Sequence, residues 1–320
     1  MLTSFADLAR AALAGGRRRC AVPGAADGHA LEAVFAAADE GYVEPVLIGP
    51  AQAIKAKLAP TGLGQRPHRL VDVPEGRNPA EAAVALVRSG EADFIFKGAM
   101  QTRDLLRPIF DKATGLNDAG FITHFGLMLI AGYPKLLAMA DGAVNPHPDL
   151  AAKRRILQAS LDALGRLGLT APVVAALAAV ESVNPKMPET LDAAALAQLG
   201  REGAFGAARV LGPISYDLAT SPEAVQIKGY AEPGAGQADM LLVPDMVTGN
   251  IMSKIWNADA RNSLAGCVIG ARVPVALTSR AAGAREKLNS LLLCCALTSG
   301  GAARPAGGAN PIRQTKETTQ

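Results

Sequence analysis

The stretch NPAEAAVALVRSGEADFIFKGA, residues 78–99, contains the pattern that decides the fold. Residues 78–92 place apolar side chains at helical spacing, with Asn78 as a plausible N-cap and Pro79 at the first helical position. The apolar run DFIFKGA (93–99) then predicts a short strand that is buried on both faces. A helix that leads directly into such a strand is typical of an α/β protein.

The same alternation continues in both directions along the chain. Helical spacing recurs at residues 31–41 and 150–169. Uninterrupted apolar runs, which are typical of strands in a parallel sheet, predict further strands at residues 45–50, 172–180, 238–244 and 266–271. We therefore expect an α/β fold with largely parallel sheets. The tail at 299–320 is rich in Gly, Ala, Pro and polar residues, so we expect it to be disordered.

Composition narrows the function classes. The 320 residues (32.8 kDa, 49% hydrophobic) suffice for one large domain or two ordinary ones. A net charge of +3 with only 4% aromatic residues gives little support for nucleic-acid binding, and it suits an anionic small molecule equally well. The sequence shows no signal peptide and no long uninterrupted apolar stretch, so we expect a cytoplasmic protein without a membrane segment.

Several common reaction centres have no counterpart in the sequence. It contains no P-loop, GxGxxG, HExxH or GxSxG motif. The 4 cysteines include no CxxC pair, so we expect structural thiols and no metal site. We interpret His124 as a packed, hydrogen-bonded residue in preference to a catalyst.

Small, polar or cationic residues follow four of the apolar runs. These stretches are residues 94–108, 137–150, 240–254 and 274–287. In open parallel sheets, ligands bind outside the carboxyl ends of the strands. We therefore expect the four ends to converge on one site.

The residues at these ends suit phosphate. Thr248, Gly249 and Asn250 precede a helical pattern near Ile251, and free backbone N–H groups at a helix N-terminus bind anions. Arg107 and Arg280 could each donate two hydrogen bonds to a phosphate, although surface ion pairs are the simpler interpretation of an isolated arginine. We interpret Arg103 as structural, on another face of its helix.

Five stretches carry a family resemblance. They are KGAMQTRDLLRP, ESVNPKMPETLDAAAL, GPISYD, GQADMLLVPDMVTGNIMSK and GARVPVALTSRA. In this order they resemble the phosphate acetyltransferase/phosphate butyryltransferase family, and most closely its shorter butyryltransferase-like branch. The resemblance runs from about residue 20 to residue 296.

The resemblance implies an architecture and a reaction. It implies two α/β domains with a cleft between them, as in the isocitrate and isopropylmalate dehydrogenases. Residues 1–122 and 270–298 would form the first domain, 123–269 an inserted second domain, and 299–320 the tail. The implied reaction converts acyl-CoA and orthophosphate into acyl phosphate and CoA, by direct transfer in a ternary complex. Coenzyme A is then a substrate, no cofactor is expected, and the protein would be a homodimer.

The resemblance also assigns roles to residues. Ser279 matches the serine that stabilises the transition state, Arg280 the arginine that holds phosphate, and Arg107 a further arginine of the cleft. Glu286 takes the position of the acidic residue that accepts the proton of the CoA thiol. Lys254 joins Thr248, Gly249 and Asn250 as a candidate for binding phosphate or CoA. Arg77 and Arg88 are the candidates for a second arginine of this kind.

The implied chemistry explains a hydroxyl beside a cation at a strand end. A hydroxyl donor aimed at the oxyanion of an acyl transfer is worth ~3 kcal/mol. We expect Ser279 and Glu286, seven positions apart, to face one side of a helix. In a purely structural alternative, Thr278 or Ser279 is the N-cap of that helix.

Two other functions compete with this one. A non-catalytic module that senses acyl-CoA or acyl phosphate remains open, because Ala282 stands where many butyryltransferase-like members have Asp. A decarboxylating dehydrogenase would need metal-binding aspartates and a nucleotide loop, and the sequence shows neither.

Overall fold

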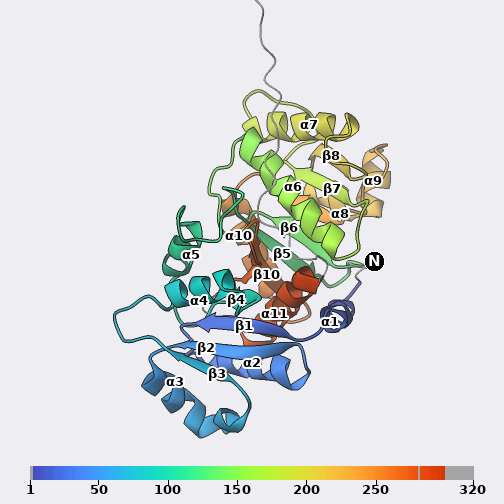
Figure 1. Cartoon of the computed structure of the whole chain (residues 1–320). Helices are drawn as coiled ribbons and strands as arrows, with labels where there is room; N and C mark the ends of the chain where they lie inside the picture. The colour runs from blue at the N-terminus through green and yellow to red at the C-terminus, as the bar shows by residue number, and fades with distance from the viewer. Residues whose placement is uncertain (1–2, 280–281, 300–320) are drawn as a thin grey trace, which may run out of the picture.

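The structure, a computed structural model, describes residues 3–279 and 282–299 (Figure 1). The predicted disordered tail beyond residue 299 lies outside the described residues. The described chain forms one sheet of 11 strands in the order β3-β2-β1-β4-β11-β10-β5-β6-β9-β7-β8. Helices cover both faces of this sheet, which confirms the α/β class with a mostly parallel sheet.

The helices and strands predicted from the sequence are among the elements that the structure describes. The strands are β1 (Arg18–Pro23), β2 (Val43–Gly49), β3 (Arg69–Asp72), β4 (Phe94–Phe96), β5 (Thr123–Leu129), β6 (Leu137–Ala140), β7 (Val173–Leu177), β8 (Arg209–Ile214), β9 (Met240–Leu242), β10 (Ser263–Ile269) and β11 (Val275–Ala276). The helices are α1 (Phe5–Ala14), α2 (Gly28–Asp39), α3 (Ala51–Leu58), α4 (Pro79–Arg88), α5 (Thr102–Phe110), α6 (Leu150–Arg166), α7 (Pro188–Arg201), α8 (Tyr216–Thr220), α9 (Pro222–Lys228), α10 (Met246–Asn257) and α11 (Ala284–Ser299), with short 3₁₀ turns at Ala59–Thr61 and Leu63–Gln65.

The stretch that decides the fold adopts the predicted elements. The Asn78 side chain accepts a hydrogen bond of 3.0 Å from the Ala80 N–H, and Pro79 opens α4. This arrangement satisfies a backbone donor at the helix start that has no partner within the helix. Strand β4 follows, and its three side chains are buried.

Strand direction divides the sheet into two parallel groups. Strands β3, β2, β1, β4 and β11 run parallel to one another, and so do β6, β9, β7 and β8. Between the groups, β10 and β5 each pair antiparallel with both neighbours. The prediction that the apolar run at 266–271 belongs to a parallel sheet was therefore wrong. Helices bury β10 on both sides, and this burial requires apolar residues whatever the strand direction.

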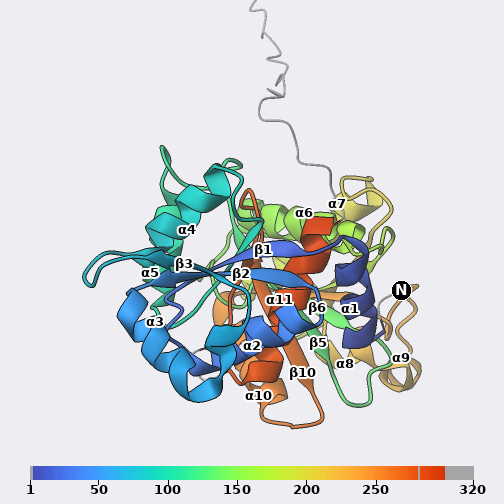
Figure 2. The same cartoon turned by 60° about the horizontal axis from the view of Figure 1, so that its bottom comes forward.

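The two faces of the sheet carry different cores. One continuous core lies on the face covered by α1, α2, α6, α7 and α11. Figure 2 shows α11 crossing this face beside α1 and α2, which it contacts. The other face carries two separate cores, one beneath α4 and α5 and one beneath α8, α9 and α10.

Two glycines mark the boundary between these separate cores. Gly126 of β5 and Gly266 of β10 are direct partners in the ladder. On the same face of β10, Leu264 packs with the core beneath α8–α10, whereas Val268 packs with the core beneath α4 and α5. Because the two glycines have no side chains, the apolar layer is interrupted at the centre of this face.

The cysteines that are scattered in sequence all lie in the interior. Cys20, Cys267, Cys294 and Cys295 are free thiols that belong to the continuous core. Burial raises the pKa of Cys20 and Cys294 well above the usual range and that of Cys295 to about 12. A thiol with such a pKa stays protonated and unreactive at neutral pH, which supports the structural interpretation.

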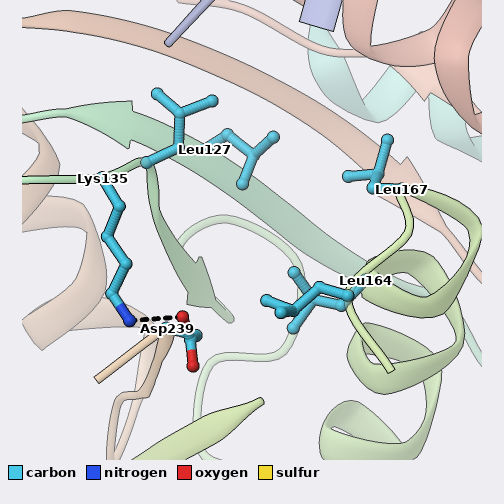
Figure 3. A pocket seen from close by; sticks show the side chains of 7 residues that line it. Leu127, Lys135, Leu164, Leu167 and Asp239 are labelled. Carbon is cyan, nitrogen blue, oxygen red and sulfur yellow. Dashed lines mark hydrogen bonds and ion pairs between the residues drawn. The ribbon is translucent and has the colours of Figure 1, made fainter. Parts of the chain in front are cut away.

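A small cavity of about 20 Å³ borders a buried ion pair (Figure 3). Lys135 pairs with Asp239, and leucines including Leu127 and Leu164 line the cavity. Asp239 also accepts a hydrogen bond of 2.7 Å from the Val173 N–H. A cavity of this size has room for about one water molecule. The ion pair joins the segments that lead into β6 and β9, and the hydrogen bond to Asp239 adds the start of β7.

Candidate active site

The four strand ends chosen from the sequence lie level with one another within the sheet. Phe96 of β4 pairs with Ala276 of β11, and Ala140 of β6 pairs with Leu242 of β9. The register across β10 and β5 places both pairs in one row, although three antiparallel pairings make the directions of β11 and β6 opposite. The prediction that the four ends converge agrees with this register, although the strands do not share a single direction.

The adjacent ends of β4 and β11 bring together a buried lysine and two hydroxyls. Lys97 follows β4; it is 3% exposed, and its N–H donates to the Ala276 carbonyl over 3.1 Å. Thr278 and Ser279 follow β11, and Ser279 is exposed. The Thr278 hydroxyl is buried and has no hydrogen-bond partner among the described residues. Sequence reasoning left Lys97 out, although a lysine directly after the apolar run FIF was a usable signal.

The segment after Ser279 differs from the prediction. Helix α11 begins at Ala284, and the Ala282 N–H donates to the Ser279 carbonyl over 3.1 Å in a turn. Ser279 therefore precedes the helix by a turn, so neither it nor Thr278 is the N-cap. The argument that Ser279 and Glu286 share one helical face was wrong for the same reason. Arg280 lies outside the described residues.

Glu286 lies in the first turn of α11 and faces the end of α10. The Asn257 side chain donates to its carboxylate over 3.4 Å. Burial raises the pKa of Glu286, while Lys287, the Asn257 hydrogen bond and Lys254 act in the opposite direction. A half-buried carboxylate with a raised pKa is a stronger base than an exposed one.

Helix α10 begins earlier than the sequence suggested. Asp245 is its N-cap, and its carboxylate accepts a hydrogen bond of 2.7 Å from the Thr248 N–H. The Gly249 N–H donates to the Asp245 carbonyl over 3.2 Å. The predicted anion site at these backbone N–H groups was therefore wrong, because a carboxylate already occupies the helix N-terminus.

Gly249 has a packing role at this end of α10. A Cβ atom at Gly249 would lie 3.0 Å from the Asp141 carbonyl oxygen and 3.0 Å from the Gly142 Cα. The next residue, Asn250, donates its side-chain N–H to the Gly142 carbonyl over 3.3 Å. Asn250, Lys254 and Asn257 recur at helical spacing, so this side of α10 leads from the Gly142 loop towards Glu286.

The arginines differ in how the described residues use them. Arg107 is exposed on α5 and has no ion pair among the described residues. Arg103 lies one turn earlier, so the two share a side of the helix, and their assignment to different faces was wrong. Arg88 donates to the Gly115 carbonyl over 3.1 Å, and Arg77 is exposed in the loop before α4.

His124 lies where the two cores of the divided face meet. Its Nδ1 is buried and has no hydrogen-bond partner among the described residues. Burial lowers the pKa of His124, whereas the Asp141 carboxylate and a hydrogen bond with the Leu277 carbonyl act to raise it. Asp141 in turn accepts hydrogen bonds from Thr123 Oγ1 over 2.8 Å and from Asn145 Nδ2 over 2.6 Å.

A second candidate region is a cavity of about 730 Å³. It lies at the carboxyl ends of β6, β7, β8 and β9, and acidic residues outnumber basic ones in its lining. The charged lining residues are Asp149, Lys153, Glu189, Asp192 and Asp245. Lys153 pairs with Asp192 over 2.7 Å, so the remaining carboxylates suit an anionic ligand poorly.

Within the part of the chain that the structure describes, no group of three or more His, Cys, Asp or Glu side chains could hold a metal ion. None of the helices in that part has the length and apolar character needed to cross a membrane.

The four strand ends and the segments that follow them fall within one family match. Residues 74–295 match the family model described as "Phosphate acetyl/butaryl transferase". The chain belongs to this family. The matched segment runs from the loop before α4 into α11, so it includes the ends of β4, β6, β9 and β11.

Relatives of this phosphate acetyl/butaryl transferase chain cover most of its length. It is 38% identical over 278 residues to "Phosphate acetyltransferase" of Rhizobium meliloti, covering 87% of each chain. It is 34% identical over 302 residues to "Phosphate butyryltransferase" of Clostridium acetobutylicum, covering 94% of this chain and 99% of that one. A solved branched-chain phosphotransacylase from Enterococcus faecalis V583 is similar with a TM-score of 0.76 and 27% identity, covering 88% of this chain and 99% of that chain.

Proposed function

We propose that this protein is a phosphate acyltransferase, which interconverts acyl-CoA and orthophosphate with an acyl phosphate and CoA. The observation that carries the proposal is the family match over residues 74–295. Relatives named for acetyl and for butyryl transfer lie at similar identity, so the acyl chain is left open between them.

The residues at the ends of β4 and β11 support this chemistry. Attack on the acyl carbonyl creates an oxyanion, and the exposed Ser279 hydroxyl would donate to it. The phosphate would be held by Arg280 and Arg107, with the buried Lys97 adding positive charge at the strand ends. No acyl-enzyme is required, because the two substrates would react directly in a ternary complex.

Glu286 would move the proton at sulfur. In the direction that forms acyl-CoA, the CoA thiol must lose its proton, and the carboxylate of Glu286 would accept it. In the other direction the same group returns the proton to the departing thiolate. The raised pKa of Glu286 supports this role, because a stronger base shares a thiol proton more effectively.

Coenzyme A would be bound as a substrate, and no cofactor is required. We keep Thr248, Gly249, Asn250 and Lys254 as candidates for contacts with CoA or phosphate. Side chains, not the backbone N–H groups of α10, would make these contacts. A cytosolic location remains a prediction of the sequence.

We also propose the two-domain division made from the sequence. The separate cores beneath α4–α5 and beneath α8–α10 support it. Strand β5 begins at Thr123 and β10 ends at Ile269, close to the proposed boundaries at 122/123 and 269/270.

A homodimer is the proposed assembly. Val247, Ile251 and Ile255 are 50%, 52% and 65% exposed and follow one another at four-residue spacing along α10. Exposed apolar side chains in such a row are typical of a subunit interface. Changing Ile251 and Ile255 together to Glu would convert the dimer to a monomer in analytical ultracentrifugation. An unchanged sedimentation coefficient would place the interface elsewhere.

The activity test is release of free CoA from acetyl-, propionyl- and butyryl-CoA, with and without orthophosphate. Phosphate-dependent release is expected, and the ratio of rates identifies the acyl group. If none of these thioesters reacts while CoA still binds in calorimetry, the enzyme assignment fails. The non-catalytic sensing module would then take its place.

A further inference from the structure

The ladder between β10 and β11 opens just before Ser279. Cys267 pairs with Ala276 and Val268 with Val275, so the next partners in register are Gly266 and Leu277. The Leu277 N–H donates to the Gly266 carbonyl over 3.1 Å, as an antiparallel ladder requires. The Gly266 N–H, however, donates over 2.9 Å to Ser290 Oγ of α11, which replaces the reciprocal bond to the Leu277 carbonyl.

The released Leu277 carbonyl meets His124 on the opposite face of the sheet. A Cβ atom placed on Gly266 would lie 2.8 Å from His124 Nε2 and 3.0 Å from the Leu277 oxygen. The imidazole and the carbonyl therefore approach the same point above Gly266. The hydrogen bond between them is one of the effects that raise the pKa of His124.

Glycines leave the room that this imidazole occupies. A Cβ atom on Gly126 would lie 4.0 Å from His124 Cε1, and one on Gly142 would lie 3.7 Å from His124 Nδ1. Three glycines from separate segments thus surround the ring. Larger residues at these positions would reduce the space for the ring or displace it from the Leu277 carbonyl.

Ser290 connects the opened Gly266–Leu277 pair to the helix that carries Glu286. Its hydroxyl accepts from the Gly266 N–H and donates over 2.9 Å to the Glu286 carbonyl. One side chain therefore touches the strand that pairs with the β11 end and the helical turn that carries Glu286.

We propose that His124 and Ser290 are positioning residues, which hold the last hydrogen-bonded pair of the β10–β11 ladder open and so fix the backbone from which Ser279 emerges. The inference rests on the proposed function, in which Ser279 takes part in acyl transfer. Neither residue needs to touch a substrate. Each satisfies one of the two backbone groups that would otherwise pull residues 277–279 back onto the sheet.

The test compares kcat and KM of purified full-length variants. Ser290→Ala and His124→Asn each remove one of the two contacts, and we expect a roughly tenfold to hundredfold loss of kcat with KM for CoA and phosphate little changed. His124→Gln should restore most of the rate, because the glutamine amide can reach as far as imidazole Nε2.

The matched control is Ser160→Ala. Ser160 is also a buried helical serine whose hydroxyl donates to the carbonyl four residues earlier, over 2.8 Å to Ile156. It has no contact to the β10–β11 ladder, so its variant should keep the normal kcat. If Ser290→Ala and His124→Asn both retain kcat within twofold of the unchanged protein, the positioning role is overturned.

Hydrogen exchange at the Gly266 amide tests the same idea without any substrate. We expect slow exchange in the unchanged protein and in Ser160→Ala, and faster exchange in Ser290→Ala. In the double variant with His124→Asn, the freed N–H and carbonyl can bond to each other, so protection should return. If the unchanged protein lacks activity but shows this pattern, the proposed function fails and the opened ladder stands. Equal Gly266 exchange in all four proteins would refute the opened ladder.

Discussion

Asn257, the last residue of α10, donates its side-chain N–H to the carboxylate of Glu286 in the first turn of α11 over 3.4 Å. This contact joins the helix that follows β9 to the helix that carries the candidate base. It also keeps Glu286 half-buried, next to Lys254 and Lys287, which oppose the effect of burial on its pKa.

Glu286→Gln should abolish most of the activity with CoA and acyl phosphate while increasing stability at neutral pH. The pKa of Glu286 is raised by burial above its ordinary value of 4.5. Its protonated form therefore favours folding, and that contribution is lost as the pH rises from 4.5 through the raised pKa. Thermal unfolding below pH 4.5 should show no difference, whereas the variant should unfold at a higher temperature at pH 8. A variant less stable than the unchanged protein at pH 8 would contradict this.

Ser279→Ala should lower kcat by a factor of roughly 10²–10³, the usual effect of losing one oxyanion donor. Its melting temperature should stay unchanged, because Ser279 is exposed and does not cap α11. Initial rates of CoA release and a thermal melt check both statements. Normal turnover with a lowered melting temperature would assign the residue a structural role.

Gly266→Ala should destabilise the fold by about 1–3 kcal/mol and reduce activity. The new methyl group would lie 2.8 Å from His124 Nε2 and 3.0 Å from the Leu277 oxygen. Gly165→Ala on α6 is the control, because its methyl group would meet nothing within 4 Å and should stabilise the helix by about 0.5–1 kcal/mol. Chemical denaturation measures both free energies of unfolding, and equal effects of the two substitutions would argue against close packing at Gly266.

Arg107→Ala should raise KM for orthophosphate, and Arg103→Ala should leave it unchanged. The two arginines lie one turn apart on the same exposed side of α5. Either substitution should therefore change the free energy of unfolding by the same small amount. A difference between them therefore reports on the site and not on the helix. Phosphate saturation curves give the KM of each variant. Equal KM values for Arg107→Ala and Arg103→Ala would exclude Arg107 from the phosphate site.

The fold class could be predicted because burial leaves its mark in a short window of sequence. Asn78 and Pro79 mark the start of α4, and β4 follows as a fully buried run, as the pattern predicted. The direction of β10 could not be predicted. The run GCVIGA is apolar because helices cover both faces, and this holds for a strand running either way.

The site could be predicted only in part. The pairing of Gly266 with Ser290, and the approach of His124 to Leu277, depend on contacts between residues far apart in the sequence. The start of α10 was missed because Asp245, its N-cap, was not recognised as a helix start in the stretch VPDMVTGN. The family resemblance supplied Ser279, Glu286 and Arg107 without any of this geometry, and their roles stay predictions.

The uninterrupted eleven-strand ladder also has a mechanical consequence. A hinge needs backbone whose dihedral angles are free to change. The chain connects the two parallel groups through β5 and β10, which are hydrogen-bonded to each other along their lengths. The continuous core on the α11 side spans this junction as well. Any movement that brings α4 and α5 closer to α8, α9 and α10 must therefore come from a change of twist shared by several strands. For the same reason, the two halves should melt in one cooperative transition, and limited proteolysis should not separate them.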